Sequence, residues 1–101
     1  MNLERAMREF EAYLDGYDRE DEKIKLKIVH TYGVVACSRE VAERMGLPGE
    51  ERELAQVIPL LHDIGRFEQL KRYDSFLPDT MDHAAYGVRI LFEEGMIRRF
   101  L

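Results

Sequence analysis

Residues 54–65 read Leu-Ala-Gln-Val-Ile-Pro-Leu-Leu-His-Asp-Ile-Gly. The apolar residues of this stretch recur at i, i+3, i+4 and i+7, which is the spacing of an amphipathic helix: Leu54, Val57, Ile58 and Leu61. Acidic residues at 50, 51 and 53 favour a helix start, and Gly65 predicts the helix end. Proline inside a helix crowds the carbonyl four residues earlier, so Pro59 predicts a kink beside His62 and Asp63.

Similar patterns before and after this stretch predict further helices. We expect one over residues 2–14, a long one from 18–21 to 45, and a short one over 67–73. Another should begin with Asp79 or Thr80 as its cap and end at Gly95, and residues 96–101 resemble the start of a further helix. No run alternates with period two. The sequence therefore predicts an all-α, compact bundle of about five helices, with residues 1–101 as a single domain.

The long helix ending at residue 45 carries apolar residues on more than one face. One stripe contains Ile24, Ile28, Val35 and Ala42. The second stripe contains Leu26, His30, Val34, Cys37 and Val41. This pattern predicts a central helix buried on two sides, with Cys37 facing the interior as an inert packing residue.

Composition excludes several classes of function. The chain has 101 residues, with 15 Lys and Arg against 20 Asp and Glu, which gives a net charge of −5. An acidic balance with scattered basic residues disfavours nucleic acid as a partner. No apolar run approaches the roughly 18 residues of a membrane span, and the N-terminus lacks the apolar stretch of a secretory signal. The single cysteine permits no internal disulfide, so a cytoplasmic location is expected.

All three histidines lie on or beside an apolar helix face, at His30, His62 and His83, and Asp63 follows His62 directly. Imidazole and carboxylate together are ligand types of mid-size divalent metals. His62 and Asp63 point about 100° apart on a helix, so they can share an ion only beside the helix end, with another helix such as that of His30 completing the shell. The simpler alternative is an ordinary bundle whose histidines are hydrogen-bonded core residues.

The combination of these motifs resembles the HD superfamily of metal-dependent phosphohydrolases. The resemblance rests on His30, on Leu60-Leu61-His62-Asp63-Ile64-Gly65-Arg66 and on Asp82-His83-Ala84-Ala85-Tyr86-Gly87. It extends over roughly residues 24–92. It implies an all-α domain that binds a divalent ion, with manganese, iron, cobalt, nickel, zinc or magnesium as candidates.

The resemblance also assigns roles to residues. It implies His30, His62 and Asp63 as metal ligands, and it places His83 where some members bind a second metal or face the substrate phosphate. The alternative for His83 is a ring hydrogen-bonded to Asp79 or Asp82. Arg66 is a candidate for steadying an anionic substrate, and its alternative is a solvated cation at a helix end.

The sequence departs from the family pattern at its last ligand. The family motif ends in an aspartate on a later helix, but no aspartate follows Asp82 here. The resemblance places that residue beyond residue 101, so the C-terminal part of the usual domain is expected to be missing. A three-ligand site can still bind a metal and leave positions open for water, although more weakly than a complete site.

Two functional hypotheses follow. The first is a phosphohydrolase that cleaves a phosphomonoester or phosphodiester, with nucleotides among the candidate substrates, through a metal-activated water that Asp63 ligates and orients, assisted by Arg66 and His83. The second is a catalytically silent domain that binds metal or nucleotide, or acts through a partner protein or self-association. Apolar surface left uncovered on the central helix would favour a homo-oligomer.

Overall fold

The computed structural model describes residues 2–77 and 80–101, and within these residues it contains helices and no strand. The elements are α1 (Leu3–Leu14), α2 (Glu22–Arg44), α3 (Gly49–Leu61), α4 (Gly65–Tyr73), α5 (His83–Val88), the π-helical turn η1 (Arg89–Glu93) and α6 (Ile97–Phe100). The prediction of an all-α bundle is confirmed. In the described part of the chain, no helix combines the length and the apolar character that crossing a membrane requires.

Side-chain caps explain where three of the helices begin. The Asn2 side chain accepts a hydrogen bond from the Arg5 amide, and Asp21 accepts from the amides of Lys23 and Ile24. Each cap satisfies an amide that has no partner within its helix. The predicted caps of the fifth helix were wrong or untested. Asp82 caps α5 by accepting from the Ala85 amide, Thr80 does not cap it, and Asp79 lies outside the described residues.

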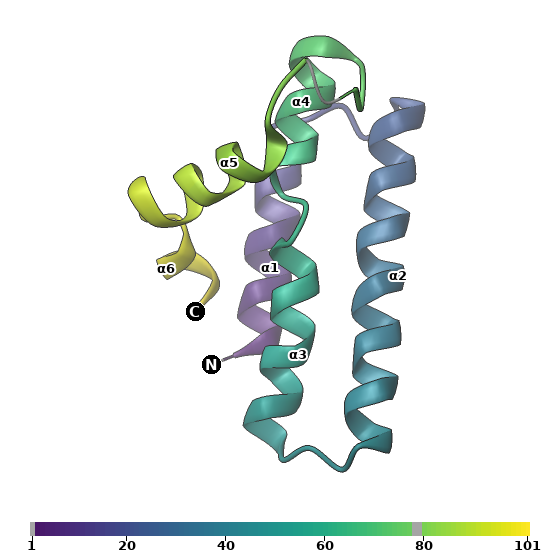
Figure 1. Ribbon diagram of the computed structural model, residues 1–101, viewed down its shortest axis with the longest axis vertical. Coiled ribbons are helices and arrows are strands. Elements are labelled where there is room, and N and C mark those ends of the chain that lie inside the picture. The colour runs from purple at the N-terminus through teal and green to yellow at the C-terminus, as the bar shows by residue number, and fades with distance from the viewer. Residues whose placement is uncertain (1, 78–79) are drawn as a thin grey trace.

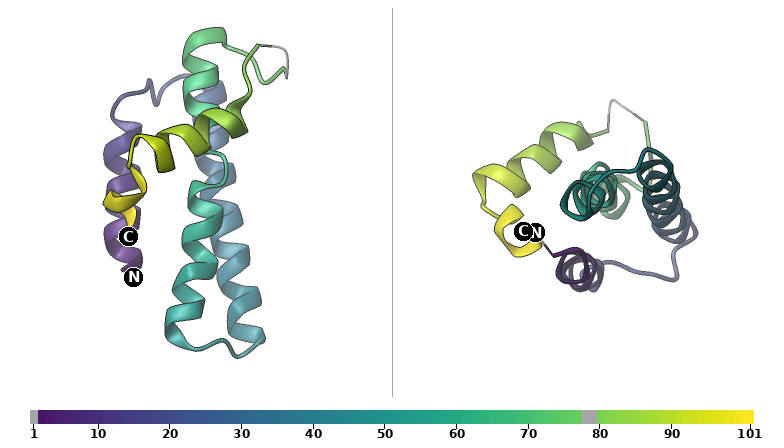
Figure 2. Two further views of the ribbon diagram at one scale, coloured as in Figure 1. Left: turned by 60° about the vertical axis from the view of Figure 1, so that its left-hand side comes forward. Right: turned by 90° about the horizontal axis from the view of Figure 1, so that it is seen from below.

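Helix α3 is the central element (Figures 1 and 2). It packs against α2 on one side and α1 on another, and α5 crosses near its C-terminal end. The prediction that α2 is central was therefore wrong. The two termini lie close together, and the Arg5 guanidinium donates to the carbonyl oxygens of Arg98 and Arg99 where α1 packs against α6.

The core lies between α1, α3, α4 and the C-terminal helices. Phe10, Phe67 and Phe100 are its largest fully buried side chains, and Phe10 meets Phe67 edge to face with ring centroids 5.9 Å apart. Leu14, Leu60 and Ile64 fill the space around these rings. Burial of side chains of this size contributes roughly 1.5–3 kcal/mol each, which fixes α4 and the end of α3 relative to α1.

Helix α2 is buried on one side only, contrary to the prediction. Ile24, Val35 and Ala42 face α3 and the core. In the second stripe Leu26, His30, Cys37 and Val41 are exposed and Val34 is half-buried, so Cys37 does not face the interior. The reason is the placement of α2 at the edge of the bundle, where the described residues cover a single face (Figure 1).

The helix predicted to reach Gly65 ends earlier. Helix α3 stops at Leu61, residues 62–64 form a turn, and Gly65 is the first residue of α4. Gly65 is required by packing, since a Cβ at this position would lie 2.0 Å from the His83 carbonyl oxygen. The break therefore places His62 and Asp63 in a turn, directly beside the start of α5.

Candidate metal centre

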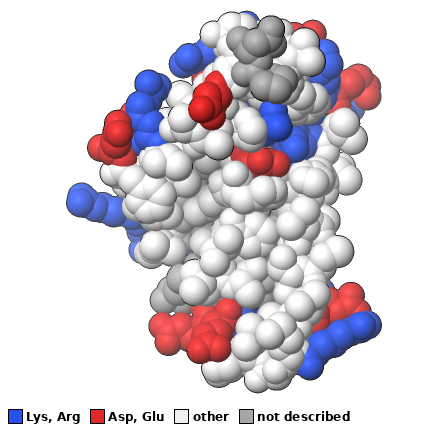
Figure 3. Space-filling view, viewed as in Figure 1, with Lys and Arg blue, Asp and Glu red and all other residues white. Residues whose placement is uncertain are grey.

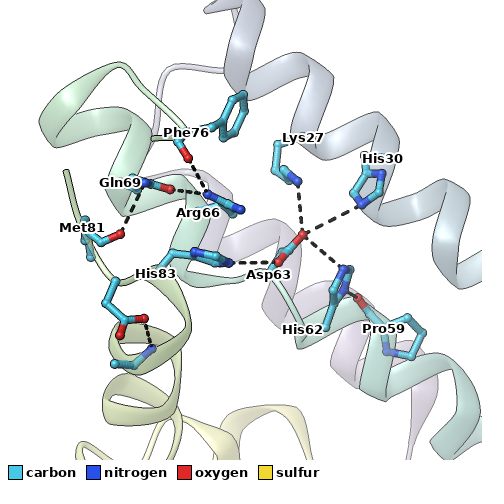
Figure 4. Close-up of polar contacts among 12 residues, drawn as sticks. Lys27, His30, Pro59, His62, Asp63, Arg66, Gln69, Phe76, Met81 and His83 are labelled. Atoms are coloured by element: carbon cyan, nitrogen blue, oxygen red, sulfur yellow. Dashed lines mark hydrogen bonds and ion pairs between the residues drawn. The ribbon is translucent and has the colours of Figure 1, made fainter. Parts of the chain in front are cut away.

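Three of the predicted site residues converge in the structure (Figure 4). His30 projects from α2, while His62 and Asp63 come from the turn between α3 and α4. One ligand atom from each residue lies within 4.8 Å of the others. His62 Nε2 is 3.2 Å and His30 Nε2 is 3.9 Å from Asp63 Oδ2. As expected from the sequence, a residue of another helix, His30, lies beside His62 and Asp63 at the end of α3.

A backbone contact orients the His62 ring. Its Nδ1 donates a hydrogen bond to the Pro59 carbonyl oxygen, one turn earlier in α3. A carbonyl can only accept, so Nδ1 carries a hydrogen and Nε2 is the ring nitrogen that faces Asp63 Oδ2. Two electron-rich atoms at 3.2 Å repel one another unless a cation or a proton lies between them. This orientation is typical of metal-binding histidines, whose other ring nitrogen is held by a carbonyl or carboxylate.

Asp63 is the centre of the polar cluster. Its Oδ2 accepts a hydrogen bond of 3.1 Å from the Lys27 ammonium, and its Oδ1 lies 3.5 Å from His83 Nε2. Partial burial alone would raise the pKa of the Asp63 carboxyl, but Lys27, with His62 and His83, holds this pKa below its ordinary value. Asp63 is therefore ionised at neutral pH and suited to bind a cation.

His83 reaches the cluster because α5 packs tightly on the start of α4. A Cβ at Gly65 would lie 2.0 Å from the His83 carbonyl oxygen, and a Cβ at Gly87, one turn later, would lie 3.5 Å from the Ile64 side chain. Burial, reinforced by the Arg66 cation and opposed by Asp63 and Asp82, lowers the pKa of His83. Its imidazole is accordingly neutral at pH 7. The alternative of a His83–Asp82 hydrogen bond is not seen, since Asp82 caps Ala85 instead, and Asp79 lies outside the described residues.

Arg66 is not a solvated cation at a helix end. It occupies the first turn of α4, where its Nη1 donates to Gln69 Oε1 at 2.8 Å and to the Phe76 carbonyl at 3.2 Å. Gln69 is itself fully buried and donates to Leu77 O and Thr80 Oγ1. These contacts hold the Arg66 guanidinium on the side of α4 that faces the polar cluster around Asp63 (Figure 4).

The donor set fits a divalent metal ion. His30, His62 and Asp63 supply two imidazole nitrogens and one ionised carboxylate from two separate elements. Such mixed N/O sets suit the mid-size divalent metals, and the three ligands leave further positions open. His30 and His62 are exposed, so the alternative of core histidines was wrong. That these residues bind a metal remains a prediction.

The fold and this cluster define a helical protein with a His/His-Asp candidate metal centre. The family model of the HD domain matches residues 28–100, which include every residue of the cluster except Lys27. The chain belongs to the HD domain family. Proteins of this family are generally metal-dependent phosphohydrolases and typically bind divalent metals. Comparison with curated proteins and with solved structures gave no match.

Two residues of the site were missed by sequence reasoning. Lys27 lies three residues before His30 and so shares its helix face, but it belongs to an alternating run with Lys23 and Lys25 that suggests solvent exposure. Gln69 had no signal beyond its position in the short helix after Gly65. The i to i+3 spacing from Lys27 to His30 was the one available indication.

Proposed function

We propose that this chain is a metal-dependent phosphohydrolase that cleaves a small phosphomonoester or phosphodiester. The observation that carries the proposal is the convergence of His30 Nε2, His62 Nε2 and an Asp63 carboxylate oxygen within 4.8 Å. In this assignment the three residues are the metal ligands. The family supports the general class of reaction.

The chemistry that a divalent cation supplies when bound is a lowered pKa of water and neutralised charge on a phosphoryl oxygen. The role of Asp63 follows from its two oxygens. Oδ2 faces His30 and His62, whereas Oδ1 faces His83. Asp63 can thus ligate through Oδ2 and orient the attacking water through Oδ1.

Arg66 and His83 are assigned to the substrate. A guanidinium matches the geometry of phosphate oxygens, and Arg66 is held by Gln69 and the Phe76 carbonyl, so little side-chain freedom is lost when it binds an anion. His83 is neutral at pH 7 and 24% exposed, so it can face the phosphate or ligate a second metal. Nucleotides are included among the candidate substrates because of the family resemblance alone.

The test combines metal analysis with activity. Purified protein is assayed against a generic phosphomonoester, a phosphodiester and a panel of nucleotides, with and without added Mn²⁺. We expect metal-dependent release of phosphate or cleavage of the diester, lost in Asp63→Asn and reduced roughly a hundredfold or more in Arg66→Met. Cys37→Ser, outside the ligand cluster, should retain activity. Metal binding without turnover of any substrate would contradict the proposed reaction.

The second stripe of α2 supports a second candidate, a domain that acts through self-association. Leu26, Cys37 and Val41 are exposed, with Leu26 at 63% and Val41 at 56%. A groove of about 560 Å³ runs beside the stripe and is lined mainly by apolar residues. On the side of the molecule seen in Figure 1, Lys, Arg, Asp and Glu gather mainly toward the two ends and leave most of the middle uncharged (Figure 3). Apolar surface of this kind is usually covered by a partner.

We propose a second copy of the chain as that partner. Sedimentation equilibrium should give twice the monomer mass of 11.9 kDa, and Val41→Glu should restore the monomer. Arg39→Glu is the matched control, because it reverses a charge on the same helix outside the stripe and should leave the dimer intact. A monomeric wild type at concentrations near one millimolar would contradict this proposal.

A further inference from the structure

A cavity with basic side chains lies beside the proposed metal ligands. The cavity, of about 310 Å³, is lined by Leu26, Lys27, His30, Arg66 and Phe76. Two of these five residues, Lys27 and Arg66, are basic, and none is acidic. The cavity adjoins the cluster through His30 and Lys27, which belong to both.

Lys27 is largely buried for a lysine. Its side chain is 14% exposed, and its ammonium donates to Asp63 Oδ2 at 3.1 Å. An ammonium has three donors, and the Asp63 contact uses one of them. The same nitrogen lies 5.5 Å from the centroid of the Phe76 ring. Lys27 is therefore held between the proposed metal ligand and the cavity (Figure 4).

Arg66 forms the other cationic wall of the cavity. Its guanidinium carbon also lies 5.5 Å from the Phe76 centroid, so one ring contacts both cations. The Arg66 Nε is buried and has no hydrogen-bond partner within residues 2–77 and 80–101. Two cations that line one cavity repel one another unless an anion lies between or beside them. Asp63 supplies one such charge for Lys27, and nothing acidic lines the Arg66 side of the cavity.

We propose that Lys27 and Arg66 form an anion-binding subsite for the phosphoryl group of the substrate, and that Lys27 exchanges its Asp63 partner for this group when a metal binds. The inference rests on the proposed function for the source of the anion. It deepens that function by adding a substrate-binding residue, Lys27, and by placing the phosphoryl group on the Phe76 side of His30.

Charge balance explains the exchange. Lys27 and Asp63 neutralise each other in the metal-free protein. With a divalent cation on Asp63, Lys27 and Arg66 face excess positive charge, and a phosphate dianion relieves it. Metal and phosphate should then increase each other's affinity, since coupling between two sites is reciprocal.

The experiment measures binding of inorganic phosphate by calorimetry, with metal-free and Mn²⁺-loaded protein. We expect the metal to strengthen phosphate binding by about tenfold or more. Lys27→Met should weaken phosphate binding to the loaded protein by about tenfold and reduce the coupling. The same variant should bind Mn²⁺ at least as tightly as wild type, because a competitor for Asp63 is gone. Lys27→Arg is the matched control and should keep phosphate binding within about threefold.

A second measurement needs no variant. In wild-type protein, acetylation by acetic anhydride is followed at each lysine by mass spectrometry. Mn²⁺ should raise the reactivity of Lys27, and phosphate added with the metal should lower it again. Lys25, which is exposed on the same helix, should change in neither step.

Two results would overturn the inference. One is unchanged phosphate affinity in Lys27→Met, which would make Lys27 only a structural partner of Asp63. The other is no phosphate binding and no protection of Lys27 in loaded wild type. Neither readout requires turnover, so a protein that binds phosphate at Lys27 but hydrolyses nothing would contradict the proposed function and leave the subsite standing.

Discussion

The Lys27 ammonium lies 3.1 Å from Asp63 Oδ2, the same oxygen that faces His30 and His62. Both partners are largely buried, with side chains 14% and 17% exposed. A cation contributed by the chain thus already neutralises the carboxylate on which metal binding is proposed to depend. The contact also joins the edge helix α2 to the turn between α3 and α4.

Removing one member of this pair should destabilise the metal-free protein. Asp63→Asn leaves the Lys27 ammonium mostly buried without a counter-charge, and we expect a loss of about 1–2 kcal/mol in the free energy of unfolding. Lys27→Met should show a loss of similar size. The double variant should recover part of it, giving a coupling energy of about 1 kcal/mol in urea titrations. Additive effects would show that the contact is not a significant interaction.

Gly65→Ala should disturb both stability and the position of His83. The added methyl would meet the His83 carbonyl oxygen at 2.0 Å, so the backbones of α4 and α5 must separate. We expect a loss of about 2–3 kcal/mol or more on thermal or urea unfolding. His83 should also become more accessible, which modification by diethylpyrocarbonate would detect.

Gly33→Ala is the matched control for this substitution. Gly33 lies within α2, and a Cβ there would meet nothing within 4 Å. Because alanine is the better helix former, the variant should be more stable than wild type by roughly 0.5–1 kcal/mol. Equal losses in both variants would contradict the role given to the Gly65–His83 contact.

The tyrosine cluster at the α1–α4 contact should make stability depend on alkaline pH. Tyr13 and Tyr17 share a hydrogen bond of 2.8 Å, and Tyr17 donates to Glu68. Burial raises the pKa of Tyr13 to about 12 and raises the pKa of Tyr17 as well. A raised folded-state pKa adds stability that is complete below the ordinary value of 10.0 and is lost as pH rises through the folded value.

The free energy of unfolding should therefore fall above about pH 10. Tyr13→Phe should flatten this decline, because the ionisation that opposes folding has been removed. Tyr73→Phe, at an exposed tyrosine on α4, is the control and should follow the wild-type curve. Urea titrations across this range measure the effect, and parallel curves for wild type and Tyr13→Phe would exclude Tyr13 as its source.

Gln69 is predicted to position Arg66. It is fully buried, accepts from the Arg66 guanidinium and donates to the segment that carries Leu77 and Thr80. Gln69→Ala should lower the free energy of unfolding by about 2 kcal/mol, because it leaves buried groups without partners. It should also weaken inorganic phosphate binding while Mn²⁺ binding stays unchanged. Loss of stability with wild-type phosphate affinity would limit Gln69 to a structural role.

Helical periodicity was sufficient for most of the fold. The apolar repeat from Leu54 to Leu61 and the acidic cap at Asp21 are local signals, and the structure contains the corresponding helices. The break after Leu61 was not predicted. The helix was predicted to reach Gly65, which instead begins α4 and lies against the His83 carbonyl oxygen, a contact between residues far apart in sequence.

The burial of α2 could not be read from its composition. Two apolar stripes indicated two covered faces, but the residue pattern does not show whether another helix packs on each face. In the described residues α3 covers the stripe that contains Val35, and Cys37 and Val41 remain exposed. An apolar stripe on a helix therefore does not show whether the protein's own core covers it or whether it lies on the surface.

The candidate site was predictable where a motif marked it. His62 and Asp63 are adjacent, and the resemblance paired them with His30 before the structure placed all three within 4.8 Å. Lys27 and Gln69 have no such mark. Lys27 acts through a tertiary contact with Asp63, 36 residues along the chain, and Gln69 contacts Arg66 within α4 and Leu77 and Thr80 beyond it.

Metal binding by wild type and His62→Ala tests the central claim most directly. Both proteins are stripped with chelator, titrated with Mn²⁺ and Zn²⁺ by calorimetry, and analysed for bound metal after dialysis. His62 is exposed, so its removal should leave the fold intact, as circular dichroism will show. We predict at least one tightly bound equivalent in wild type and a loss of affinity of about a hundredfold in His62→Ala, with Cys37→Ser unchanged. Equal metal binding by wild type and His62→Ala, whether strong or absent, would contradict the account.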